Sequence, residues 1–73
     1  MAATSAGMHA LVRMANQIAT NVSHQSPDAA ATEIAGHLNS FWAPSMRADL
    51  LEFAASGGAG LDDLVVAALP QVR

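Results

Sequence analysis

The stretch that decides the fold is Leu38-Asn39-Ser40-Phe41-Trp42-Ala43-Pro44-Ser45-Met46-Arg47, in which two adjacent aromatic residues come shortly before a proline. A proline restricts the residue before it, here Ala43, to extended conformations, and it suits the first turn of a helix. We therefore expect one helix to end near Trp42 and the next helix to begin at Pro44. The two helices should meet at a tight bend.

Upstream of this bend, apolar residues recur at the spacing of two amphipathic helices. One helix is predicted from about Ser5 to Asn21, and Ser26 is a suitable N-cap for a second helix from about Pro27 to Phe41. The stripe of the first helix consists of Met8, Leu11, Val12, Ala15, Ile18, Ala19 and Val22. The stripe of the second consists of Ala30, Ile34, Leu38 and Phe41.

Downstream of the bend, the pattern predicts a third helix over residues 44–55 and a short fourth helix over residues 63–69. Gly57-Gly58-Ala59-Gly60 separates them as an interhelix turn, because glycines readily adopt the positive φ that ends a helix. Asp62 is a suitable N-cap for the fourth helix, which Pro70 should end. The prediction is an all-α fold: one domain over residues 1–73, built as a small bundle of three to four short helices, with residues 1–7 as a flexible N-terminal extension.

The apolar content of the chain predicts a thin core. Of the 73 residues 52% are hydrophobic, but 17 of these are alanine and only 21 are larger. A chain of this size usually needs extra stabilisation, and since it has no cysteine to form a disulfide, we expect a bound partner to supply it. Trp42 could lie in the core or on the surface. The expected core residues are Met8, Leu11, Ala15, Ile18, Ile34, Leu38, Phe41, Leu50 and Leu64.

The charge of the chain argues against several classes of partner. Three arginines and no lysine stand against six acidic residues, so the net charge is −3. A chain with so few cations is poorly suited to a run of phosphates or to an anionic membrane surface. It has no apolar run long enough to span a bilayer and no charged start typical of a signal peptide. We therefore expect a cytoplasmic protein that binds neither nucleic acid nor membrane.

The sequence contains no recognisable catalytic, cofactor-binding or metal-binding constellation. His9, His24 and His37 are too far apart along the chain to share one turn of a helix, as a typical pair of metal ligands would. The adjacent pair Asp62 and Asp63 is better explained by helix capping than by catalysis. The absence of cysteine excludes thiolate ligands for a metal or an iron–sulfur cluster. We therefore predict that the chain is not an enzyme and holds no cofactor.

Protein recognition is the better prediction, because tryptophan and arginine often dominate the binding energy of interfaces. Arg47 lies beside the apolar stripe of its helix, so either its stem covers apolar surface or its guanidinium pairs with a carboxylate or a helix-end carbonyl, which we expect a partner to supply. Arg13 could instead be a solvated charge on the amide-rich face of the first helix. The candidate interface residues are Arg13, Asn16, Gln17, Trp42, Met46 and Arg47.

Three blocks of this sequence, in order, resemble one known family. They are LVRMANQIA at residues 11–19, FWAPSMR at residues 41–47 and GGAGLDDLV at residues 57–65. Together they resemble the delta subunit of soluble NAD-dependent formate dehydrogenase, and the resemblance extends from about Leu11 to Leu69.

The resemblance implies a non-catalytic accessory subunit that docks on the catalytic alpha subunit and supports its assembly or stability. In that family the alpha subunit carries a bis-pyranopterin molybdenum or tungsten cofactor and iron–sulfur clusters. The beta/gamma subunits carry FMN, further clusters and the NAD site. The delta chain carries none of these groups. Two alternatives remain at this point: a transient maturation chaperone for molybdenum-cofactor insertion, and a free-standing helical protein-binding module.

Overall fold

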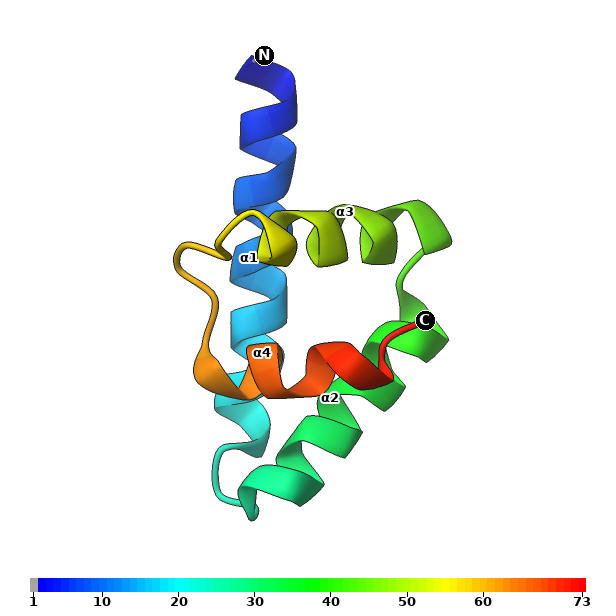
Figure 1. Ribbon diagram of the computed structural model, residues 1–73. Coiled ribbons are helices and arrows are strands. Elements are labelled where there is room, and N and C mark those ends of the chain that lie inside the picture. The colour runs from blue at the N-terminus through cyan, green and yellow to red at the C-terminus, as the bar shows by residue number, and fades with distance from the viewer. Residues whose placement is uncertain (1) are drawn as a thin grey trace.

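Helices make up most of residues 2–73, which are the residues that the computed structural model describes; side chains are described from Gly7 onward. Figure 1 shows their arrangement, and no strand occurs in this part of the chain. The predicted all-α, single-domain fold is confirmed. The elements are α1 (Ala2–Val22), α2 (Pro27–Phe41), α3 (Pro44–Ala55), α4 (Asp63–Ala68) and the short 3-10 helix η1 (Leu69–Gln71).

The N-terminal turns of α1 project beyond the other helices (Figure 1). Helix α1 begins at Ala2, so residues 2–7, which we expected to be a flexible extension, are helical. Because helical structure does not measure mobility, the flexibility of this segment stays a prediction. Met1 lies outside the described residues.

The predicted starts of α2, α3 and α4 are confirmed by local contacts. The Ser26 side chain accepts a hydrogen bond from the backbone N–H of Ala29, at 3.4 Å. Asp62 accepts one from the N–H of Leu64, at 2.9 Å. Ala43 is extended, with φ −63° and ψ 149°, immediately before Pro44. Capping side chains and proline therefore begin these helices as their local chemistry requires.

The end of α4 differs by one residue from the prediction. The α-helix ends at Ala68, and residues 69–71 continue as η1, with Pro70 in its first turn. Proline is tolerated there because the first turn of a helix leaves its N–H groups without helical partners. Pro70 thus ends α4, and the chain continues as the 3-10 helix η1.

The core is thin, as expected, and alanine forms much of it. The largest fully buried side chains are Ile34, Leu38, Leu50 and Val65. Around them α2 packs extensively against α4 and also against α1, while α1 packs against α3. Small side chains let these helices approach closely, but each contributes little apolar area. The other buried residues are Ala15, Ala19, Val22, Ala30, Ala31, Ala35, Trp42, Ala68 and Val72.

The expected burial of Phe41 is wrong, and its neighbour Trp42 is buried in its place. Phe41 is 75% exposed, whereas Trp42 is 6% exposed. Helix α2 ends at Phe41, and Trp42 takes an extended conformation with φ −86° and ψ 141°. A helical wheel cannot represent this change of direction, which brings the indole into the core. The Phe41 ring lies instead against the ring of His37, with centroids 4.8 Å apart.

The other expected core residues agree with the structure, except Met8. Four of them, Ala15, Ile34, Leu38 and Leu50, are fully buried. Leu11, Ile18 and Leu64 are half-buried against the core. Met8 is also half-buried, but it lies at a surface hollow rather than in the core.

We expect Leu38→Asp to unfold the domain, since a carboxylate at this buried position has no partner to offset its desolvation. The expected loss is about 3–5 kcal/mol in the free energy of unfolding, which is a large part of the stability of a small domain. Circular dichroism during urea titration measures it. Thr32→Asp is the matched control, because this exposed position in the middle of α2 should change stability by less than about 0.5 kcal/mol. A fully helical, stable Leu38→Asp variant would contradict the described core.

Candidate functional site

Asn16 ties the loop between α3 and α4 to α1. Its Nδ2 donates a hydrogen bond to the carbonyl oxygen of Gly60, at 2.8 Å, and its Oδ1 accepts one from the N–H of Asp62, also at 2.8 Å. Leu61 lies between these two backbone groups and packs partly buried against the core. The amide of Asn16 therefore holds the backbone on both sides of Leu61, which is far from Asn16 in the sequence.

Asn39 holds the chain after α4 in the same way. Its Nδ2 donates to the carbonyl oxygen of Gln71, at 3.0 Å, and its Oδ1 accepts from the N–H of Arg73, at 2.9 Å. The residue between them, Val72, is extended and 8% exposed. The two asparagine clamps thus fasten the segments on either side of α4 to α1 and α2.

Arg47 joins three parts of the chain at the bend between α2 and α3. Its Nε donates to the carbonyl oxygen of Arg73, at 2.8 Å, and its Nη1 donates to the carbonyl oxygens of Trp42 and Asn39. Carbonyls at a helix C-terminus lack helical partners and carry partial negative charge. Of the two alternatives for Arg47, the structure shows the guanidinium paired with backbone carbonyls, two at the end of α2 and one beyond η1. These carbonyls come from this chain and not from a partner.

The six candidate interface residues do not form one patch. Arg13 and Gln17 are exposed, Met46 is half-buried and Trp42 is buried. The side chains of Asn16 and Arg47 already bind backbone groups of this chain. Asn16, Trp42 and Arg47 therefore have roles inside the domain, and a contact of any of the six with a partner stays a prediction.

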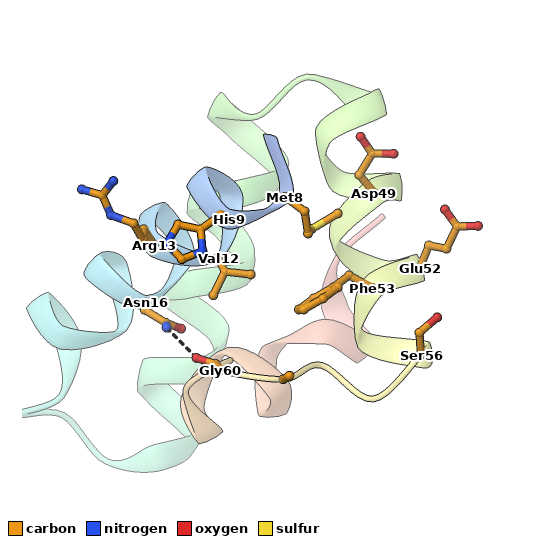
Figure 2. A pocket seen from close by; sticks show the side chains of 11 residues that line it. Met8, His9, Val12, Arg13, Asn16, Asp49, Glu52, Phe53, Ser56 and Gly60 are labelled. Atoms are coloured by element: carbon orange, nitrogen blue, oxygen red, sulfur yellow. Dashed lines mark hydrogen bonds between the residues drawn. The ribbon is translucent and has the colours of Figure 1, made fainter. Parts of the chain in front are cut away.

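A groove lies between α1 and α3 and is closed at one end by the loop before Gly60 (Figure 2). Its volume is about 700 Å³. The apolar side chains of Met8, Val12 and Phe53 lie toward its centre in Figure 2. The groove is therefore a hollow with an apolar centre on the described surface. The polar side chains that line it are His9, Arg13, Asn16, Asp49, Glu52 and Ser56.

Sequence patterns predicted parts of this groove but not the groove itself. Asp49 and Glu52 point away from the core, as the helical spacing indicates, and Arg13 lies on the polar side of its helix. What the spacing cannot show is that α3 crosses α1, which brings residues from both helices to one hollow. The only signal for the groove in the sequence was the opposite net charge of the two helices: α1 carries Arg13 and no acidic residue, whereas α3 carries two acidic residues and one arginine.

The loop that closes the groove depends on its glycines, and Gly58 shows why. Its φ is +62°, and a Cβ there would lie 3.3 Å from Cδ1 of Leu61 and 3.4 Å from Cα of Ala54. A larger residue would therefore meet both an unfavourable backbone conformation and crowding. This loop is the predicted interhelix turn.

Neither a metal site nor a membrane span occurs among the described residues. In this part of the chain, no three histidine, cysteine or acidic residues lie close enough together to hold a metal ion. No helix among the described elements has the length and apolar character needed to cross a membrane.

A comparison with protein families decides the family. The model of FdsD, the delta subunit of NADH-dependent formate dehydrogenase, matches residues 10–69. The chain belongs to this delta subunit family. The match contains all three sequence blocks that carried the predicted resemblance, which is thereby confirmed. It also covers Asn16, Asn39 and Arg47, whose side chains hold the domain together. No match was found among curated proteins.

For the delta subunit fold, we expect Asn16→Ala to weaken the attachment of the loop to α1. Loss of two hydrogen bonds should lower the free energy of unfolding by about 1–3 kcal/mol. Urea titration followed by circular dichroism measures the change. Gln17→Ala is the control, since the Gln17 amide bonds only Asn21 on its own helix. Equal stability of the two variants would show that the Asn16 clamp contributes nothing to the free energy of unfolding.

Arg47→Lys should destabilise the domain although it keeps the charge. Lysine lacks the planar fork of donors with which the guanidinium reaches several carbonyls at once. The expected loss is about 1.5–3 kcal/mol in the free energy of unfolding, measured by thermal or urea unfolding. The control is Arg13→Lys, because Arg13 is exposed and the exchange should leave stability unchanged. An Arg47→Lys variant as stable as this control would contradict the structural role of the guanidinium.

Proposed function

We propose that this chain is a non-catalytic accessory subunit that docks on the catalytic alpha subunit of formate dehydrogenase and supports its assembly or stability. The observation that carries the proposal is the family match over residues 10–69, which covers most of the chain. A delta subunit is by definition one part of a larger complex.

The composition of the chain supports a role through protein contact. Its sequence has no cysteine, so it offers no thiolate ligand for an iron–sulfur cluster. We assign the bis-pyranopterin molybdenum or tungsten cofactor and iron–sulfur clusters to the alpha subunit, and FMN, further clusters and the NAD site to the beta/gamma subunits. In this proposal the delta chain itself holds none of these groups, and it works in the cytoplasm with its partners.

The thin core gives a physical reason for stable association. A partner that binds only the folded state adds its binding free energy to the stability of that state. Among the predicted interface residues, Arg13, Gln17 and Met46 keep side chains at the surface. In our proposal these three contact the alpha subunit, while Asn16, Trp42 and Arg47 hold the surface in shape.

The test is to purify a tagged alpha subunit from cells that make the whole complex, with and without this chain. We expect the chain to co-purify in equal amounts with the alpha subunit of the mature enzyme. Its deletion should lower the yield of assembled complex and the formate-dependent reduction of NAD per cell. The yield of alpha subunit mRNA is the control for expression.

Two results would overturn parts of the proposal. A fully active and equally stable complex without this chain would remove the supporting role. Enrichment of the chain on cofactor-free alpha subunit, with depletion from the mature enzyme, would make it a transient maturation chaperone instead. Failure to associate with any subunit would leave a free-standing binding module.

A further inference from the structure

We infer that the groove between α1 and α3 binds an amphipathic helix of the alpha subunit, one that carries acidic residues on the side facing α1 and basic residues on the side facing α3. This inference rests on the proposed function. It adds the surface that is used, the secondary structure of the segment that fills it, and the charge pattern of that segment.

The walls of the groove determine which kind of backbone can occupy it. Both walls are α-helices, whose interior backbone groups already bond within the helix. The described part of the chain has no strand, so an extended segment could not add itself to a sheet edge. An extended segment in the groove would find no strand edge to pair with, so its N–H and C=O groups would depend on water. A helix satisfies its backbone internally and presents only side chains, so a helix fits.

The floor of the groove supplies the apolar contact. Met8 and Phe53 approach from opposite helices, with Val12 beside them (Figure 2). Met8, Val12 and Phe53 are half-buried, so part of each side chain stays open to solvent. Helices that bind in grooves place apolar residues at positions i, i+3, i+4 and i+7 on such a floor. The volume of about 700 Å³ gives room for several of these side chains.

The rims of the groove carry charges of opposite sign. On the α1 side stands Arg13, with His9 one turn before it, and residues 2–22 contain no acidic residue. On the α3 side stand Asp49 and Glu52. Figure 2 shows the carboxylates directed to one side and the guanidinium to the other, so these charges do not meet each other. They remain available to a partner.

This charge pattern specifies the partner helix. Acidic residues along one side of it would face Arg13, and basic residues along the other side would face Asp49 and Glu52. Two carboxylates against one guanidinium give the groove a net negative charge, so the occupant should carry more basic than acidic residues on its flanks. Complementary charges of this kind set the orientation and the partner more than the affinity.

A small molecule fits the groove less well. Pockets for small ligands enclose most of the ligand and aim a few polar groups at it. Here the carboxylates and the guanidinium stand at the rims and point outward (Figure 2). An apolar floor with charged edges is the pattern of a docking surface.

Association with the tagged alpha subunit tests the inference in full-length chains. We expect Val12→Asp to weaken binding by about tenfold to a hundredfold, because it puts a charge on the apolar floor. The double variant Asp49→Lys/Glu52→Lys should weaken binding as well, and more strongly at low salt. Asp28→Lys/Glu33→Lys is the matched control: it makes the same change of charge on exposed residues of α2 that do not line the groove. Circular dichroism verifies that each variant is folded.

A cross-linking experiment identifies the occupant directly and does not depend on the folding of Val12→Asp. Because the chain has no cysteine, Ser56→Cys introduces a single thiol at the groove, and Ser40→Cys introduces one on the exposed side of α2. A thiol-to-amine cross-linker should join Ser56→Cys to an alpha subunit peptide with apolar residues at helical spacing and basic residues beside them. The Ser40→Cys variant should not capture this peptide.

The outcomes separate this inference from the proposed function. If the wild-type chain binds the alpha subunit and both groove variants bind equally well, the groove is not the interface although the function stands. If the wild-type chain does not bind at all, the proposed function fails first. A captured peptide without the helical apolar pattern overturns the inference. So does a stable dimer of this chain that Val12→Asp dissociates, since the occupant would then be a second copy.

Discussion

The arrangement of the helices depends on the contact that Arg47 makes at the bend between α2 and α3. Its guanidinium donates to carbonyl oxygens of Asn39, Trp42 and Arg73, which belong to the end of α2 and to the segment after α4. The carbonyls of Asn39 and Trp42 would otherwise lack partners at a half-buried site. By satisfying them the guanidinium stabilises the bend, and the bend sets the direction in which α3 crosses α1 (Figure 1).

The asparagine clamps compensate for a core made largely of alanine. Small buried side chains allow close packing of α1, α2 and α4 but contribute little transfer free energy. Asn16 and Asn39 therefore hold the connecting segments by hydrogen bonds, each across a single residue, Leu61 or Val72, whose side chain packs into the core. Directional bonds fix positions that a thin core would specify poorly.

The internal contacts of Asn16 and Arg47 also shape the groove. The Asn16 clamp holds the loop that closes the end of the groove, and the bend at Arg47 places α3 along its other wall. A surface that is held in its binding shape before association loses less conformational entropy when the partner arrives. For a small subunit in a large complex, the polar contacts inside the domain thus support the proposed contact outside it.

Local chemistry determined the helices. Ser26, Pro44 and Asp62 begin α2, α3 and α4 through constraints that act between close neighbours in the chain, so the sequence alone predicted these three starts and the bend. The start of α1, expected near Ser5, lies at Ala2. The family could also be predicted from the sequence alone, because the three blocks that indicate it are short stretches of consecutive residues. The tertiary structure decided the rest. It buries Trp42 and exposes Phe41, because the chain leaves the helical path between them. Asn16 was predicted to lie on a polar surface, and its partners lie 44 and 46 residues away. No local pattern encodes such contacts or the groove, because they exist only once α3 has been placed across α1.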